Sequence, residues 1–158
     1  MKDLLRTEDL SRADVELLIS TAAEFATEPT KASAALAHKT VAIYMSKPST
    51  RTRLASETAV AHLGGTPIFL RGEDLQIGRG ETIADTARVI SQFCNALLIR
   101  TFAQSDVDEL GANASIPVIN GLTDTTIQPK CLLISLRFVR NSALIFRDVN
   151  LFKLFSMF

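Results

Sequence analysis

Apolar residues along this chain fall into short runs separated by longer stretches in which apolar positions recur with helical spacing. The runs at 40–45, 66–70, 96–99 and 117–119 are predicted strands, because they are short, apolar and bounded by polar or glycine residues. The stretches 50–63, 82–94 and 106–114 are predicted helices, and an earlier helix follows Ser11 as its N-cap. Residues 71–81 are polar and contain glycine, which predicts a loop.

Strand and helix alternate four times, which predicts an α/β fold: a four-stranded parallel sheet with helices on both faces. In such sheets ligands bind beyond the carboxyl ends of the strands. Ser49, Thr52, Arg100 and Asn120 each follow the end of a predicted strand. We therefore expect four loops that are distant in sequence to meet at one site.

Composition narrows the function classes. Hydrophobic residues make up 47% of the 158 residues, charged residues 22%, and the formal net charge is zero, so nothing indicates a nucleic-acid partner. No apolar run is long enough to span a membrane, and the N-terminus lacks the apolar core of a signal peptide. Cys94 and Cys131 form no metal or redox motif, and Cys94 is expected to be a buried thiol. These observations predict a cytoplasmic protein without a metal.

The most informative segment is residues 47–53, Lys-Pro-Ser-Thr-Arg-Thr-Arg, which lies between the first predicted strand and the next helix. A helix start leaves backbone N–H groups without partners and carries partial positive charge, so it suits a phosphate. Arg51 and Arg53 can add forked, charge-assisted hydrogen bonds. The alternative is an ordinary helix cap followed by two solvated arginines.

Five stretches in order resemble the aspartate and ornithine carbamoyltransferase family, and the resemblance covers residues 1–126. Residues 47–53 look like the carbamoyl phosphate motif of both branches. Residues 75–81 (Leu-Gln-Ile-Gly-Arg-Gly-Glu), 85–91 (Asp-Thr-Ala-Arg-Val-Ile-Ser) and 99–102 (Ile-Arg-Thr-Phe) favour the ornithine branch, as does Gln76, which stands where the aspartate branch usually has lysine. The fifth stretch is 118–124 (Val-Ile-Asn-Gly-Leu-Thr-Asp).

The resemblance implies roles for individual residues. Ser49, Thr50, Arg51 and Thr52 would hold the phosphate of carbamoyl phosphate. Arg100 would bridge the phosphate and the carbamoyl oxygen, which Thr52 helps to polarise, so Arg51, Thr52 and Arg100 are the catalytic candidates. Gln76 would reach carbamoyl phosphate from its loop, in the site of a neighbouring subunit. The implied reaction gives citrulline and phosphate from carbamoyl phosphate and ornithine, in arginine metabolism, without cofactor or protein nucleophile, in a homotrimer.

Two departures from the family pattern flank the phosphate motif. The family commonly has Phe-Glu where this chain has Met45-Ser46, and Ser-Phe-Glu where it has Ala55-Ser56-Glu57. We expect these changes to alter helix packing and to leave the charges of the site in place. Asp85 and Arg88 are predicted to pair on one helix, and Asp85 is a further candidate for orienting neighbours of the phosphate site.

After Asp124 the chain departs from the family. The family has a His-Pro-Cys-Gln or His-Pro-Thr-Gln motif there, whereas residues 125–131 read Thr-Thr-Ile-Gln-Pro-Lys-Cys. Back-translated with each codon starting on the old third base, residues 125–137 permit His-His-Pro-Thr-Gln, then Met or Val, then Leu-Ala-Asp-Ile-Leu-Thr. We therefore predict a domain at 1–124 that binds carbamoyl phosphate and an out-of-frame, non-family tail at 125–158 that replaces the ornithine-binding domain.

This hypothesis leaves several functions open. The chain is an enzyme by family, and with the second domain replaced it is expected to form little citrulline. It is otherwise an inactive fragment that binds phosphate or carbamoyl phosphate, or a truncated product that docks on intact subunits. An amphipathic membrane-surface helix is a further interpretation of the apolar and basic residues 132–158, and an unselected tail prone to aggregation is the simpler one.

Overall fold

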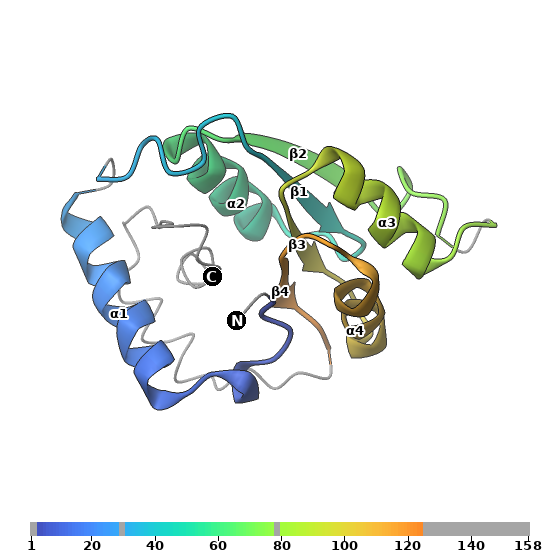
Figure 1. Ribbon diagram of the computed structural model, residues 1–158, viewed down its shortest axis with the longest axis horizontal. Helices are drawn as coiled ribbons and strands as arrows, with labels where there is room; N and C mark the ends of the chain where they lie inside the picture. Colours follow the sequence, from blue (N-terminus) through green and yellow to red (C-terminus); the bar gives the residue numbers. More distant parts are fainter. Residues whose placement is uncertain (1–2, 29–30, 78–79, 125–158) are drawn as a thin grey trace.

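The computed structural model describes residues 3–28, 31–77 and 80–124 of the chain (Figure 1). The predicted tail at 125–158 lies outside these residues. A short 3₁₀ turn at Thr7–Asp9 precedes the helices and strands, which follow in the order α1 (Arg12–Thr27), β1 (Thr40–Met45), α2 (Thr50–His62), β2 (Thr66–Arg71), α3 (Ile83–Phe93), β3 (Ala96–Arg100), α4 (Gln104–Asn113) and β4 (Val118–Leu122). The predicted α/β fold is confirmed, with boundaries that shift by at most three residues.

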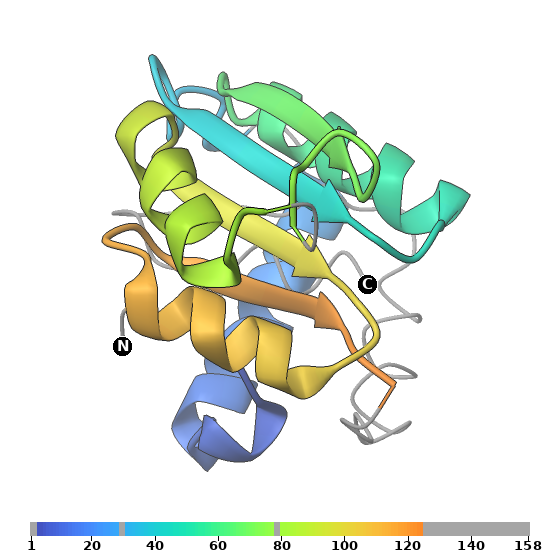
Figure 2. The same cartoon turned by 90° about the vertical axis from the view of Figure 1, so that its right-hand side faces the viewer.

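The four strands form one parallel sheet in the order β2-β1-β3-β4. The chain leaves β1 toward β2 on one side and returns to β3 on the other, so the strand order reverses between β1 and β3. Met45 and Arg100, the last residues of these two strands, lie side by side in the register. The strand ends gather at one edge (Figure 2). A crevice at such a reversal is the usual ligand position in open α/β sheets.

Helices cover both faces of the sheet, as predicted (Figure 1). On one face α1 and α2 pack over a cluster that includes Phe25, Ile43 and Leu98, while α3 and α4 cover the other face over Ile90, Leu97 and Val107. Successive residues of β1 and β3 alternate between the two clusters, as the pleat requires. Both faces of these central strands are buried, which explains why the strands read as continuous apolar runs.

Local sequence signals fix where the helices begin and end. Ser11 caps α1 with a reciprocal capping box to Asp14, and Thr82 caps α3 by accepting a hydrogen bond from the backbone N–H of Asp85. After α2, Gly64 adopts a φ of 78°, and a Cβ there would lie 2.5 Å from the backbone oxygen of Ser33. The predicted glycine stop is therefore confirmed, because the turn needs a residue without a side chain.

Asp85 lies in the first turn of α3, and its side chain contacts residues of the same helix and its N-cap. Its carboxylate accepts hydrogen bonds from the Thr82 hydroxyl at 2.7 Å and from Arg88 at 2.8 Å, which confirms the predicted ion pair. Arg88 also reaches Asn113 on α4. The hydrogen bonds of Asp85 itself stay within α3 and its N-cap, and it is Arg88 that links α3 to α4. That Asp85 orients neighbours of the phosphate site stays a prediction.

The pH dependence of thermal stability should show the contribution of Asp85 at the N-terminus of α3. The hydrogen bond from Thr82, followed by the charge of Arg88, lowers the pKa of Asp85 below its usual value. A carboxyl with a lowered folded-state pKa contributes stability above its unfolded pKa of about 3.9 and loses it as the pH falls through the folded value. Between pH 6 and pH 3, the melting temperature of Asp85→Asn should therefore fall by less than the melting temperature of the wild type does. Equal acid sensitivity of both proteins would contradict this assignment.

Three further properties concern the described residues. None of the helices described is long and apolar enough to cross a membrane. In residues 3–28, 31–77 and 80–124, no three His, Cys, Asp or Glu side chains gather in a way that would hold a metal ion. Cys94 is a free, buried thiol, as predicted, and burial raises its pKa.

Candidate functional site

The predicted phosphate turn lies at the start of α2. Ser49 is the N-cap: its hydroxyl oxygen accepts a hydrogen bond from the backbone N–H of Thr52 at 3.4 Å, and its hydroxyl donates to Thr52 Oγ1 at 2.9 Å. The first intrahelical bond runs from the N–H of Arg53 to the carbonyl of Ser49. The N–H groups of Thr50 and Arg51 precede that bond, so the helix itself supplies no partner for them.

Arg100 faces this turn from the end of β3. Its Nη1 donates to Thr52 Oγ1 at 2.8 Å, which places the guanidinium next to the N-cap. Among the described residues Arg100 Nε has no hydrogen-bond partner, although that atom is buried. Partial burial lowers the pKa of Arg100, and the nearby carboxylate of Asp124 opposes the shift. The side chain stays charged at neutral pH, because a guanidinium is not deprotonated in proteins.

Two further members of the motif, Thr50 and Arg51, are exposed at the same turn. In the described part of the chain their side chains make no hydrogen bond, so both remain available to a ligand in solution. The turn thus combines helix N–H groups, three hydroxyls and two guanidiniums within one loop and the adjacent strand end. A dianion such as phosphate matches this arrangement in charge and in acceptor number.

Arg53 does not belong to this cluster. Its guanidinium lies 3.8 Å from the centre of the Phe69 ring on β2, and its Nε donates to Glu57 at 3.1 Å. The expectation that Arg53 adds a forked hydrogen bond to phosphate is therefore wrong in this structure. Alternate residues at a helix start point in different directions, and Arg53 points toward the edge strand, where a ring and a carboxylate hold it.

A lysine–carboxylate pair beside the turn was not predicted. Lys47 forms an ion pair with Asp124, which follows β4, and its ammonium lies 5.3 Å from the centre of the Phe102 ring. The pair connects the loop after β1 to the loop after β4 across the end of β3. The signal available in the sequence was weak: Lys47 comes two residues after the predicted strand 40–45, and Asp124 comes five residues after the predicted strand 117–119. Parallel strands bring such segments together at one edge of the sheet.

Gln76 was expected at the site, but it lies on a different loop from the phosphate turn. It is exposed in the loop between β2 and α3, and its backbone carbonyl accepts a hydrogen bond from Glu81. No hydrogen bond among the described residues joins its side chain to Ser49, Thr52 or Arg100. That Gln76 reaches carbamoyl phosphate in a neighbouring subunit stays a prediction.

Asn120 is not a site residue, contrary to expectation. It lies inside β4, is 2% exposed, and does not follow the strand. Its amide donates to the carbonyl of Leu5 at 2.9 Å and to Gln104 Oε1 at 3.1 Å, and its Oδ1 accepts from the N–H of Leu122. Both polar atoms of the Asn120 side chain are thus hydrogen-bonded within the protein, so this side chain stabilises the fold and does not face a ligand.

Removing the N-cap hydroxyl tests the turn directly. Ser49→Ala should lower the free energy of unfolding by about 1 kcal/mol through loss of the cap. It should also weaken phosphate binding, measured by calorimetry, by about two- to tenfold through loss of one neutral hydrogen-bonding group. Ser11→Ala is the matched control, because Ser11 caps α1. If the two variants bind phosphate with equal affinity, Ser49 does not contribute to phosphate binding.

Comparison with known proteins agrees with this geometry. Residues 2–136 match the family model described as "Aspartate/ornithine carbamoyltransferase, carbamoyl-P binding domain". The chain is 49% identical over 123 residues to the ornithine carbamoyltransferase of Bacillus subtilis, covering 78% of this chain and 38% of the relative. It is 46% identical over 125 residues to that of Pyrococcus horikoshii, covering 78% and 39%.

A solved structure gives the same result. The ornithine carbamoyltransferase of Pyrococcus furiosus superimposes with a TM-score of 0.77 at 40% identity, covering 87% of this chain and 44% of that one. The chain spans about two fifths of the length of the curated relatives named above. The chain therefore belongs to the aspartate/ornithine carbamoyltransferase family, and residues 2–136 match its carbamoyl-P binding domain.

Proposed function

We propose that this chain binds carbamoyl phosphate at the start of α2, as the carbamoyl phosphate half of an ornithine carbamoyltransferase. The observation that carries the proposal is the 2.8 Å hydrogen bond from Arg100 to Thr52, which brings a guanidinium to a capped helix start. The relatives at 46–49% identity are ornithine carbamoyltransferases, which favours ornithine over aspartate as the second substrate.

The residues then have separate tasks. Ser49, Thr50 and Arg51 hold the phosphate with helix N–H groups, hydroxyls and a guanidinium. Arg100 lies between the phosphate and the carbamoyl oxygen, and Thr52 donates to that oxygen. When the amine of ornithine attacks the carbonyl carbon, negative charge grows on the carbonyl oxygen while the bond to phosphate breaks. Cationic donors that are already in place stabilise both charges without having to reorganise.

Several finer statements belong to the same proposal. Gln76 reaches the site of a neighbouring subunit in a homotrimer, and the protein serves arginine metabolism in the cytoplasm. Residues 125–137 are read out of frame. With the ornithine-binding domain replaced by the proposed out-of-frame tail, we expect binding of carbamoyl phosphate with little or no citrulline formation. The alternatives are an inactive phosphate-binding fragment and a product that docks on intact subunits.

Calorimetry and an activity assay separate these functions. Saturable binding of carbamoyl phosphate and of inorganic phosphate is the expected result, and absence of both would reject the proposal. A citrulline assay with ornithine distinguishes the enzyme from a binding fragment. Nucleotide sequencing across codons 120–140 tests the frameshift. An uninterrupted frame with no hidden His-Pro motif in the shifted frame would reject that part alone.

A further inference from the structure

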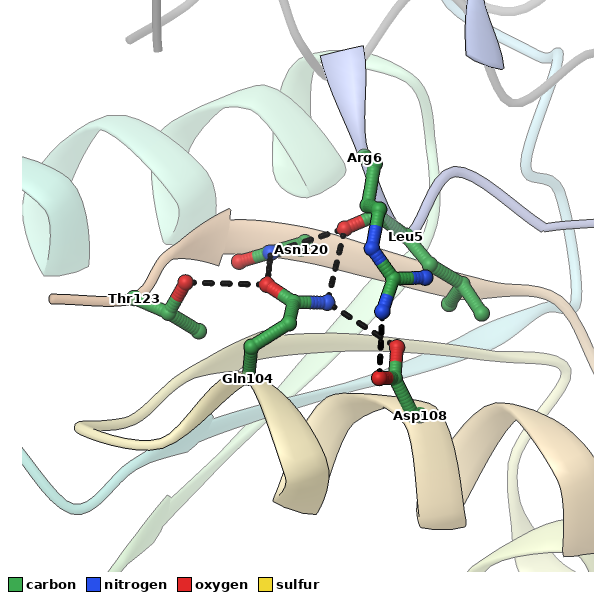
Figure 3. Close-up of polar contacts among 6 residues, drawn as sticks. All are labelled: Leu5, Arg6, Gln104, Asp108, Asn120 and Thr123. Carbon is green, nitrogen blue, oxygen red and sulfur yellow. Dashed lines mark hydrogen bonds and ion pairs between the residues drawn. The ribbon is translucent and has the colours of Figure 1, made fainter. Parts of the chain in front are cut away.

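Gln104, the first residue of α4, joins three parts of the molecule through its side-chain amide (Figure 3). Its Nε2 donates to the carbonyl of Leu5 at 3.2 Å and to Asp108 Oδ1 at 3.0 Å. Its Oε1 accepts from Asn120 Nδ2 at 3.1 Å and from the Thr123 hydroxyl at 2.9 Å. Two donated and two accepted bonds use the full capacity of a primary amide.

The donor half of this amide, its Nε2, faces the N-terminal segment. That segment lies along the edge of β4 that does not pair with β3. The N–H of Leu4 donates to Val118, and the N–H of Asn120 donates back to Leu4. Arg6 forms an ion pair with Asp108 at 2.5 Å. The Leu5 side chain packs so closely on α4 that a Cβ at Gly111 would lie 2.8 Å from it. This half therefore anchors residues 4–6 to the sheet and to α4.

The acceptor half faces an irregularity in β4. Ile99 pairs with Asn120 and Arg100 pairs with Leu122, so Gly121 is an extra residue opposite this pair, as in a β-bulge. The Asn120 side chain closes the bulge by accepting from the N–H of Leu122 at 2.9 Å. The two side chains that Gln104 Oε1 holds, those of Asn120 and Thr123, lie on either side of the bulge. Bulges often re-aim neighbouring side chains next to functional sites.

The bulge lies directly beside two charged residues of the candidate site. Arg100 is the residue paired across it, and Asp124, the partner of Lys47, follows Thr123. The N–H of Asp124 also donates to the carbonyl of Phe102 at 2.9 Å. A shift of the bulge would therefore move Arg100 relative to Thr52 and Asp124 relative to Lys47.

We propose that Gln104 is a positioning residue for the phosphate site: its carbonyl oxygen fixes the bulge at Gly121 and thereby aims Arg100 at the turn of residues 49–52. This proposal rests on the proposed phosphate binding. Gln104 itself does not touch the ligand. Its donor half contributes to stability, and its acceptor half positions Arg100. Mutations can therefore separate the effect on stability from the effect on phosphate binding.

Two substitutions at the same position make this separation measurable. Gln104→Leu removes both halves and should lower the melting temperature and weaken the affinity for inorganic phosphate by about two- to thirtyfold. Gln104→Glu keeps the acceptor oxygen but places a carboxylate beside Asp108. It should lower the melting temperature and yet recover phosphate affinity to within about twofold of the wild type at 0.15 M salt, where the Debye length is about 8 Å.

Thr123→Val removes the hydrogen bond that the Thr123 hydroxyl donates to Gln104 Oε1 and keeps the shape of the side chain. It should weaken phosphate binding with little loss of stability, and it replaces Gln104→Leu as the test should that variant fail to fold. Gln92→Leu, at an exposed position on α3, is the control and should change neither quantity. All titrations are made well below each variant's melting temperature.

The outcomes decide between positioning and plain structural support. Weak phosphate binding by Gln104→Leu and Thr123→Val, with recovery in Gln104→Glu, supports the proposal. Folded Gln104→Leu or Thr123→Val that binds phosphate like the wild type, or affinity that follows melting temperature across the series, overturns it. A wild-type protein that binds no phosphate rejects the proposed function and this inference together.

Discussion

Replacing Arg100 with methionine is expected to weaken the binding of inorganic phosphate and of carbamoyl phosphate by about 30- to 150-fold, or about 2–3 kcal/mol. Methionine keeps the apolar stem and removes the guanidinium that donates to Thr52 and carries the buried Nε. The free energy of unfolding should change little, because a partly buried charge is costly to keep in the folded state. Calorimetric titration and urea unfolding measure the two quantities.

Arg88→Met is the control for this experiment. Arg88 is an exposed arginine on α3, and its pairing with Asp85 resembles the surface pairs that contribute little to stability. It carries the same charge as Arg100, so it also corrects for the change in net charge. If both variants bind phosphate like the wild type, Arg100 takes no part in anion binding. If both lose affinity equally, the effect belongs to net charge and not to the site.

Leu98→Ala should destabilise the fold by about 2–5 kcal/mol, since it leaves a cavity in a fully buried position. Leu98 is 0% exposed on the central strand β3 and packs in the cluster under α1 and α2. This loss is a large part of the stability of a typical domain. Urea denaturation followed by circular dichroism measures it.

Leu54→Ala is the matched control, because Leu54 is 58% exposed on α2. Its free energy of unfolding should change by less than about 0.5 kcal/mol. A cost below about 1 kcal/mol for Leu98→Ala would contradict the packing of β3 between the two helical layers. Because β3 carries Arg100, loss of the fold in Leu98→Ala should also abolish phosphate binding.

The sequence predicted the central strands better than the edges of the fold. Residues 40–45 formed the expected strand without any shift, because a strand buried on both faces needs an unbroken apolar run. Strand β4 ends three residues later than predicted, at Leu122. Asn120 and Gly121 look like loop residues, but the bulge and the amide of Gln104 keep them in the sheet.

The candidate site divides in the same way. The N-cap of α2 and the position of Arg100 at a strand end follow from local pattern. Arg53 and Lys47 do not, because the partners that hold them, Phe69 and Asp124, come from other elements. Local spacing places a charged side chain on an element, and only tertiary packing decides whether it faces the ligand or a neighbouring ring or carboxylate.

The central claim is that the turn between Lys47 and Arg53, together with Arg100, binds a phosphate dianion. A titration of the ¹⁵N-labelled chain with inorganic phosphate, followed by amide and arginine side-chain resonances, tests this most directly. We expect saturable shifts at the backbone N–H groups of residues 49–53 and at Arg100 Nε. Saturable shifts located elsewhere, or no shift at these groups at millimolar phosphate, would contradict the account.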